Sequence, residues 1–529
     1  MKTVLLRPPM VVPRLSHSAC ICPPIGLAYI AAAIQKADLD VRCVDALGEA
    51  PFQRIVLENP NFLTFGLSAP EIVERVGKCD VIGITLMFSQ DWPVARSIIR
   101  DLRQTYPQAT IVGGGEHISA CPEFCLEDCP EMDICVLGEG EETIVELLEA
   151  LEENRSLENV SGIVYRSREG PVRTPPRSRI TELEEIAWPA WDLFPLENYL
   201  ANGLGYGVAP GRTVPLILSR GCPYECTFCS NPQMWTTRWK ARATDDVINE
   251  MQCYIDHYGA ENFDFYDLTT IVRKDWIVEF CEKVIERQWK ISWQMPSGTR
   301  SEALDHEVLH LMALSNQRNL CYAPESGSPT TLKKIKKKVN LDRMKESIRA
   351  ALKEGMNVKL NMIMGFPHET DKELLETWGF LKEMALMGVH DVYIACFSPY
   401  PGSELFNQLY EAGQIKEMND DYFFKLTSFS DISYSHSYSP HLSHRRLTFY
   451  RLGGMLLFYT LSYLIRPTRL FRTLWNLLRG REESRGEMTL RQMIDRFLRK
   501  KTLLKDVNVG ALDATSYAQS RATTMARVP

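Results

Sequence analysis

The chain lacks any long hydrophobic run. None of its 529 residues falls in a stretch that reaches the roughly 18 consecutive apolar residues of a membrane-spanning helix. The longest candidate, residues 455–465, is interrupted by Thr460 and Ser462. The N-terminal residues also lack the apolar core and the small-residue cleavage site of a signal peptide. These absences predict a cytoplasmic protein.

The chain also lacks an excess of positive charge. Its 60 Lys and Arg against 67 Asp and Glu give a net charge of −7, which argues against a protein that coats nucleic acid. No internal repeat is visible. A composition that is 45% hydrophobic and 24% charged is typical of globular proteins, and the length predicts about three domains.

Residues 1–153 alternate short apolar runs with helical periodicity, which predicts a Rossmann-like α/β domain with a parallel sheet. Two glycine-rich loops follow its fourth and fifth predicted strands, Gly113-Gly114-Gly115-Glu116-His117 and Gly138-Glu139-Gly140-Glu141. Ligands of such sheets bind beyond the carboxyl ends of the strands, although glycines there can also simply form tight turns. The expected strands are 2–6, 41–44, 81–86, 110–112 and 134–137, and the expected helices are 27–35, 94–104 and 143–151.

The rest of the chain divides by composition. Residues 154–210 are rich in proline and predict an irregular linker whose tryptophans pack on a domain surface. Residues 211–410 resume the alternation with six β/α units, which predicts a partial (β/α)6 barrel with its chemistry at the carboxyl ends of the strands. Residues 411–510 predict an α-helical C-terminal region, and residues 511–529 a disordered tail.

Three closely spaced cysteines follow the first predicted barrel strand. Cys222, Cys226 and Cys229 have the spacing C-x3-C-x2-C, with no fourth Cys or His nearby. A structural zinc site normally needs four protein ligands. Three thiolates on one loop instead suit a 4Fe–4S cluster in which one iron has no protein ligand.

This motif, after the first strand of a β/α barrel, resembles that of the radical S-adenosylmethionine (SAM) enzymes. The resemblance implies that the open iron binds SAM and that the reduced cluster cleaves it to a 5′-deoxyadenosyl radical, which abstracts hydrogen from an unactivated carbon. An electron donor such as flavodoxin or ferredoxin is implied as well. By the same resemblance the expected SAM contacts are Tyr224, Phe228, Asp267, Arg300, Glu325, Ser326 and Gly365. For each of them, ordinary packing at the barrel rim is the alternative.

A sheet domain before the barrel resembles the cobalamin-binding branch of these enzymes. The resemblance extends to about residue 410 and implies that Gly113, Gly114, Gly115, His117, Gly138 and Glu139 contact cobalamin. The chain lacks the D-x-H-x-x-G loop that supplies a histidine ligand to cobalt in other methyltransferases. The sequence therefore does not identify a lower axial ligand of cobalt. His117 could equally be satisfied within its own turn.

Two further patterns allow more than one interpretation. Cys121, Cys125 and Cys129 are spaced as one helical stripe, so a second metal cluster competes with simple burial. Residues 441–505 carry fifteen Lys or Arg against four Asp or Glu, interleaved with apolar side chains. They predict a helical cap on the barrel or a contact with a membrane surface. The lysines at 333, 334 and 336–338 are expected at a solvated helix end.

The architecture favours methyl transfer from methylcobalamin to a substrate carbon. The alternatives are oxidative ring formation, as in the anaerobic magnesium-protoporphyrin monomethyl ester cyclase, and radical chemistry without cobalamin. The stretch from Arg220 to Ser230 resembles that cyclase too, but Asp267-Leu268-Thr269-Thr270 stands where we expect a run of acids in the cyclase. The basic and aromatic C-terminal helices favour a hydrophobic small-molecule substrate.

Overall fold

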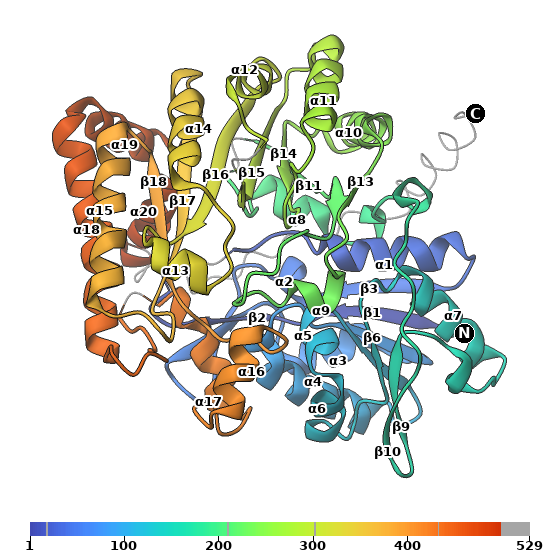
Figure 1. The fold of residues 1–529 in the computed structure, drawn as a ribbon. Helices are drawn as coiled ribbons and strands as arrows, with labels where there is room; N and C mark the ends of the chain where they lie inside the picture. The colour runs from blue at the N-terminus through green and yellow to red at the C-terminus, as the bar shows by residue number, and fades with distance from the viewer. Residues whose placement is uncertain (17–19, 209–210, 301–302, 432, 499–529) are drawn as a thin grey trace.

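The computed structural model describes residues 1–16, 20–208, 211–300, 303–431 and 433–498. It places a sheet domain beneath a partial barrel, with the C-terminal helices along one flank of the barrel (Figure 1). The predicted tail at 511–529 and the last residues of the predicted helical region lie outside the described residues.

The first domain is built on a seven-stranded mixed sheet. Its parallel part has the order β3-β1-β6-β7-β8, which is the flavodoxin-like doubly wound order. All five strands predicted for residues 1–153 are present. In spatial order the sheet consists of β10 (Gly170–Arg173), β9 (Ile163–Ser167), β8 (Ile134–Val136), β7 (Thr110–Gly114), β6 (Val81–Thr85), β1 (Thr3–Arg7) and β3 (Val41–Asp45).

Helices cover both faces of this sheet because its central strands are apolar on both sides. Val4 and Leu6 of β1 pack in the core that contains α3 and α4, whereas Leu5 packs in the core that contains α1 and α7. The helices of the domain are α1 (Ile25–Lys36), α2 (Ala46–Glu49), α3 (Ala69–Val76), α4 (Trp92–Thr105), α5 (Glu116–Ala120), α6 (Pro122–Asp128) and α7 (Glu141–Glu152).

Two features of this half were not predicted. Residues 163–173, expected within an irregular linker, form the hairpin β9–β10, which adds two antiparallel strands to the sheet edge. A small antiparallel sheet, β2 (Met10–Pro13), β5 (Phe62–Phe65) and β4 (Arg54–Val56), lies beside the end of β1. The rest of the linker packs as expected. Trp191 of the 3-10 helix η4 (Trp191–Leu193) and Tyr199 of α8 (Leu196–Ala201) are both buried.

The second domain contains the six predicted parallel strands in chain order, so it is an open barrel. They are β11 (Thr213–Leu216), β14 (Asn262–Phe265), β15 (Ser292–Thr299), β16 (Gln317–Glu325), β17 (Asn357–Met364) and β18 (Asp391–Cys396). Its outer helices are α10 (Thr244–Tyr258), α11 (Lys274–Arg287), α12 (His306–Leu314), α14 (Leu341–Lys353) and α15 (Asp371–Met387). Shorter elements at the rim are β12 (Ser219–Arg220), β13 (Lys240–Ala241), α9 (Asn231–Trp235), α13 (Pro329–Lys334) and α16 (Glu404–Glu411).

The C-terminal helices cover the open β18 edge of the barrel (Figure 1). They are α18 (His444–Ile465), α19 (Pro467–Arg479) and α20 (Arg485–Leu498), whereas α17 (Asp420–Lys425) packs against α4 of the first domain. α18 packs on α15 and β18 through side chains such as Leu447 and Phe458, which are fully buried. The predicted helical cap is therefore present. No helix among the described residues is both long and apolar enough to cross a membrane.

Candidate active site between the sheet domain and the barrel

The three motif cysteines lie on one loop between β12 and α9. Neighbouring elements hold this loop at both sides: Thr227 N donates to Ile335 O at the end of α13 (3.1 Å), and Leu405 N of α16 donates to Thr227 O (2.9 Å). The loop also tightens on itself, because Cys229 N donates to Cys226 O (3.0 Å). The barrel therefore fixes the loop backbone from two helices far away in the sequence.

The three thiols suit a cluster better than a single ion. Among the described residues, one group of His, Cys, Asp or Glu brings three ligand atoms within 4.8 Å of one another, and it is His117, Cys121 and Cys125. The three motif sulfurs do not all lie within that distance, so they are spread more widely than a single ion requires. A 4Fe–4S cube needs this wider spacing, because each sulfur binds a different iron. The geometry and chemistry of Cys222, Cys226 and Cys229 thus fit the cluster.

A buried cation stands beside these cysteines. The Lys337 side chain is only 9% exposed, and its Nζ lies 2.9 Å from Glu325 Oε1. Burial raises the pKa of the Cys226 thiol, and the positive charge of Lys337 opposes that rise. Burial also raises the pKa of Cys229 to about 12. The prediction that all the lysines at 333–338 are solvated is therefore wrong for Lys337, because Glu325 lies close enough to bind it.

The structure groups several of the residues predicted to contact SAM. The guanidinium of Arg300 lies 3.5 Å from the ring centroid of Tyr224, so it stacks on an aromatic face inside the cysteine motif. Phe228 packs against Phe366, with ring centroids 5.7 Å apart. Glu325 ends β16 with φ of +68°, which turns its side chain toward Lys337. These residues surround the cysteine loop.

Three other predicted SAM residues have protein partners. The Asp267 carboxylate accepts hydrogen bonds from Ser219 N (2.5 Å) and Leu218 N (3.1 Å), and burial raises its pKa to about 6. Ser326 Oγ lies 3.1 Å from Thr377 Oγ1. At Gly365, with φ of +91°, an added Cβ would lie 2.6 Å from a Leu447 methyl group. Their contacts with SAM stay predictions.

Asn231 was not singled out from the sequence. It lies two residues after the last cysteine, is 3% exposed, and leaves both amide atoms buried without a hydrogen-bond partner. Unpaired buried amides are costly, so a polar ligand atom is expected beside it. Its position directly after the cysteine motif was the available signal.

A buried ion cluster joins the two domains at the same loop. Arg220, immediately before the motif, contacts Glu139 at 3.1 Å and also pairs with Glu141, and all three side chains are at most 10% exposed. Arg179 contacts the other oxygen of Glu139 at 2.9 Å. These cations outweigh the effect of burial and lower the pKa of Glu139. Glu139, predicted to contact cobalamin, therefore has partners within the protein.

The glycine-rich loops of the first sheet present backbone to the barrel. A Cβ at Gly114 would meet nothing within 4 Å, whereas one at Gly115 would lie 2.8 Å from Leu86 O. Gly138 has φ of +65° and donates to Ser119 Oγ at 2.9 Å. Gly113, by contrast, faces the core, where a Cβ would lie 2.7 Å from Met132 Sδ. Gly114 is thus the glycine of this loop with open space before it.

His117 lies inside the first domain. Its ring is 1% exposed, packs on Trp92 with centroids 5.3 Å apart, and places Nδ1 3.0 Å from Ser89 Oγ. Cys125 Sγ lies 3.5 Å from its Nε2. Contact with cobalamin stays a prediction for His117, and the ring has partners of its own.

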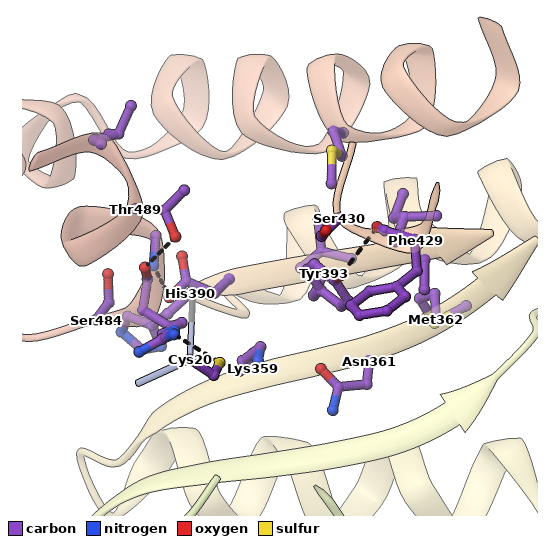
Figure 2. Close-up of a pocket in the computed structure, with 18 of the residues that line it drawn as sticks. Cys20, Lys359, Asn361, Met362, His390, Tyr393, Phe429, Ser430, Ser484 and Thr489 are labelled. Atoms are coloured by element: carbon purple, nitrogen blue, oxygen red, sulfur yellow. Dashed lines mark hydrogen bonds between the residues drawn. The ribbon is translucent and has the colours of Figure 1, made fainter. Parts of the chain in front are cut away.

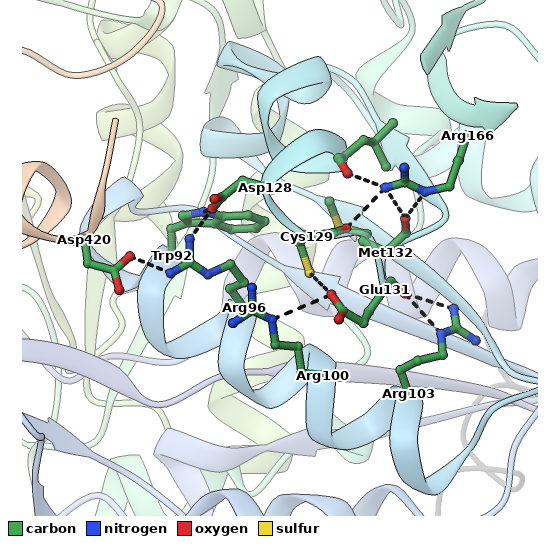
Figure 3. Close-up of polar contacts among 11 residues, drawn as sticks. Trp92, Arg96, Arg100, Arg103, Asp128, Cys129, Glu131, Met132, Arg166 and Asp420 are labelled. Carbon is green, nitrogen blue, oxygen red and sulfur yellow. Dashed lines mark hydrogen bonds and ion pairs between the residues drawn. The ribbon is translucent and has the colours of Figure 1, made fainter. Parts of the chain in front are cut away.

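The predicted cysteine stripe is present along α6, but its three thiols have different partners. Cys121 and Cys129 flank this helix and Cys125 lies within it, and backbone hydrogen bonds of 3.0 and 3.1 Å join the three residues. Cys121 and Cys125 join His117, whereas the Cys129 thiol donates to Glu131 at 3.6 Å (Figure 3). Cys129 lies in a network of arginines between α4 and α6, and Arg96 extends it to Asp420 of α17 at 2.6 Å. The stripe therefore supplies no three-thiolate ligand set.

One cavity of about 1140 Å³ opens between the two domains. Val11 and Gln90, which follow β1 and β6 of the first sheet, line it together with Phe228 and Glu325 from the barrel. The order of the sheet reverses between β1 and β6, which is where ligands of doubly wound sheets bind. Gln90 Oε1 is buried without a hydrogen-bond partner. An open crevice with an unpaired amide oxygen fits a corrinoid rich in amide groups.

The comparisons with known proteins agree with this geometry. Residues 216–381 match the model of the radical SAM superfamily, and residues 13–148 match that of the B12 binding domain. The chain is 30% identical over 423 residues to an uncharacterized methyltransferase of Pyrococcus horikoshii, covering 79% of this chain and 85% of that one. It is 30% identical over 446 residues to cytidylyl-2-hydroxyethylphosphonate methyltransferase of Streptomyces wedmorensis, covering 78% and 82%.

Solved structures share the fold at low sequence identity. The radical SAM methyltransferase TsrM of Kitasatospora setae, solved with cobalamin and a 4Fe–4S cluster, superposes with a TM-score of 0.65 at 15% identity, covering 87% of this chain and 89% of that one. The cobalamin-dependent radical SAM enzyme OxsB gives a TM-score of 0.66 at 15% identity, covering 99% and 80%.

The three-cysteine loop at the rim of a partial β/α barrel, together with the matched superfamily model, defines a radical SAM enzyme. The chain belongs to the cobalamin-binding branch of the radical SAM superfamily. Its cofactors are accordingly a 4Fe–4S cluster, SAM and cobalamin.

Proposed function

We propose that this enzyme transfers a methyl group to an unactivated carbon of a small molecule. The observation that carries the proposal is the single cavity lined both by the crevice of the first sheet and by Phe228 and Glu325 at the cysteine loop. A substrate in that cavity lies between the two cofactor sites. Both relatives described above carry the name methyltransferase.

The cofactors, when bound, supply the reductive cleavage of SAM to a 5′-deoxyadenosyl radical and the methyl group to be transferred. The protein positions them. Cys222, Cys226 and Cys229 would hold the cluster, and Arg300, which stacks on Tyr224 and donates to Lys338 O, would bind the SAM carboxylate. The apolar walls around Phe228 exclude water from the reacting carbon.

The test is anaerobic turnover with SAM carrying a labelled methyl group and candidate substrates. We expect release of 5′-deoxyadenosine under strong reductant and a product that gains one CH₂ with the label. Base-off corrinoid absorbance after reconstitution is expected as well. A product that loses hydrogens without gaining carbon would contradict methyl transfer.

A product that loses hydrogens without gaining carbon is expected for the alternative function, an oxidative cyclase. The chain is 25% identical over 394 residues to the anaerobic magnesium-protoporphyrin IX monomethyl ester cyclase of Rubrivivax gelatinosus, covering 73% of this chain and 66% of that one. Activity that persists in protein reconstituted without cobalamin would support the third possibility, a radical enzyme that does not use it.

The electron donor, of the flavodoxin or ferredoxin kind, and a hydrophobic substrate belong to the same proposal. A peripheral membrane contact has support from α19, on which Phe471 is 70% and Leu478 82% exposed beside several arginines. Exposed apolar side chains next to basic residues are typical of helices that lie on anionic lipid surfaces.

A further inference from the structure

The cavity continues through the barrel, away from the cysteine loop. Alternate residues of β17, namely Asn357, Lys359, Asn361 and Ile363, are partly exposed and line it, whereas the residues between them are buried. Figure 2 shows Lys359 and Asn361 on the same side of this strand, with Tyr393 of β18 nearby. Residues with higher numbers on this parallel strand lie nearer the cysteine loop.

Lys359 is a cation without an anion. Within the described part of the chain its ammonium forms no hydrogen bond or ion pair, and its nearest notable contact is the Tyr393 ring, 5.5 Å from Nζ to the centroid. Asp391 is its register partner on β18. The Asp391 carboxylate instead accepts from Gly486 N at 2.9 Å and from Tyr459 OH at 3.3 Å.

At the end of the cavity far from the cysteine loop, two arginines also lack carboxylate partners. Arg466 donates to Ala385 O and Leu386 O, and Arg469 donates to Gly388 O and Val389 O. These carbonyls at the end of α15 satisfy hydrogen bonds but carry no full negative charge. Arg472 is the exception, because it pairs with Glu483.

The positive potential that results acts on a neighbouring group. Burial lowers the pKa of His390 to about 3, and the charges of Arg469, Arg472 and Arg466 lower it further in the same direction. Arg469 is itself affected, since burial and then Arg466 lower its pKa. The basic Lys359, Arg466, Arg469, Arg472 and Arg485 outnumber the acidic Asp391, Glu483 and Glu487 in the lining of this end. This excess of positive charge in a half-buried region favours an anionic ligand.

The middle of the cavity offers a polar contact. Asn361 Oδ1 is buried without a hydrogen-bond partner, so it can accept from a hydroxyl or amide of a ligand. Around it the lining is largely apolar, with Met362, Ile363 and Tyr393 nearby. The walls thus change from charged to apolar along β17 toward the cysteine loop.

We propose that the substrate is amphipathic, with an oxyanion group bound by Lys359 and an apolar part that places the reacting carbon beside Phe228. The inference rests on the proposed function and names the substrate class of that site. At about 3.3 Å per residue, the four steps along β17 from Lys359 to Ile363 span about 13 Å, so we infer a similar distance between the anionic group and the reacting carbon.

The test is equilibrium dialysis of the anaerobic holoenzyme with dodecyl phosphate, dodecanoate and dodecanol, each below its micelle concentration. The variants are Lys359→Met and Lys359→Arg, with Lys382→Met, an exposed lysine of α15, as the matched control. We expect Lys359→Met to weaken binding of the two anions at least tenfold, with dodecanol changed less than twofold. Lys359→Arg should retain most of the anion binding, and Lys382→Met all of it.

Equal binding of the anions by Lys359→Met and the parent would overturn the inference, as would an equal loss of dodecanol binding. So would a parent enzyme that binds neither anion saturably. Preference between the two anions distinguishes a phosphate ester from a carboxylate. Iron content and bound cobalamin of Lys359→Met should match those of the parent, and methyl transfer is measured separately on the parent enzyme, so failure of this inference can be told apart from failure of the proposed function.

Discussion

The two ends of the interdomain cavity differ in whether their cations have acidic partners. At the cysteine loop every buried cation discussed above has a close acceptor: Lys337 pairs with Glu325 and Arg220 with Glu139. At the far end Lys359 has no anionic partner among the described residues. Buried charges are tolerated when they are paired, so the paired set has a positioning role. The unpaired set is available to a ligand.

The largest effect is expected at the cysteine loop. Replacing Cys222 by Ala leaves two thiolates, which cannot hold the cluster, so release of 5′-deoxyadenosine should fall below detection. Iron content and SAM-dependent product measured by chromatography check this. Cys253→Ala, on α10 outside the motif, is the control and should retain both. A Cys222→Ala protein with full iron content would refute the cluster assignment.

The paired cluster between the domains is tested by Arg220→Met. This change leaves Glu139 and Glu141 buried without that cation, and breaking buried pairs costs about 3–5 kcal/mol. We expect a lower midpoint of thermal unfolding and a cysteine loop that loses iron faster. The triple variant with Glu139→Gln and Glu141→Gln should regain much of the stability. An unchanged midpoint in the single variant would show that the pairs do not join the domains.

Lys337→Met tests the cation beside the thiols. Glu325 then stays buried next to the cluster without its partner, and charged hydrogen bonds of this kind contribute about 1.5–3 kcal/mol. We expect SAM cleavage to slow about tenfold or more, and the cluster to become harder to reduce in a spectroscopic redox titration. Lys333→Met, exposed on α13, should change neither value. Equal rates in both variants would place Lys337 outside the site.

Glu369 provides a test that depends on pH. It accepts from Gly365 N at 2.7 Å and Phe366 N at 3.1 Å, and burial raises its pKa from 4.5 to about 7. The folded state therefore binds this proton more tightly than the unfolded state. The stabilisation is complete below about pH 4.5 and is lost as the pH rises through 7, by at most about 3 kcal/mol.

Glu369→Gln keeps an acceptor for both amides and removes the titration. We expect its thermal midpoint to exceed that of the parent by the largest amount at pH 8 and to approach it only near pH 4.5. Equal pH profiles for the two proteins would show that folding does not shift the pKa of Glu369.

The smallest effect on catalysis is expected outside the cavity. Phe471→Ser with Leu478→Ser removes two exposed apolar side chains of α19. Flotation of the full chain with anionic vesicles should decrease severalfold, while 5′-deoxyadenosine release stays unchanged. Leu314→Ser, exposed on α12, is the control. Equal flotation of the parent and the double variant would remove the support for membrane contact.

Local sequence patterns were sufficient for the strands and the cysteine loop. Strands with strong apolar runs, such as β1 and β17, form where predicted, and the spacing of Cys222, Cys226 and Cys229 predicts the cluster ligands. The hairpin β9–β10 was missed because Pro171 and the surrounding polar residues indicate a loop, whereas pairing with the edge strand β8 stabilises it.

The site was harder to predict where it depends on contacts across the chain. Lys337 looked solvated because its burial comes from Glu325, twelve residues earlier, and from the cysteine loop. Glu139 was predicted to contact cobalamin from the resemblance of its loop, and its pairing with Arg220, 81 residues away, was not visible in the sequence. Lys359 has no ion pair with Asp391, its neighbour on β18, whose carboxylate instead accepts hydrogen bonds from Tyr459 and Gly486. Such tertiary partners leave no periodic signal in one sequence.

The ion cluster of Arg220 has a consequence for engineering chimeric enzymes. Because Glu139 and Glu141 of the sheet domain hold the residue just before the cysteine motif, the two modules share one rigid junction. A graft that exchanges the corrinoid module alone would bring a foreign β8–α7 turn against this arginine. Transplants should therefore carry the acidic turn and the arginine together as a matched set.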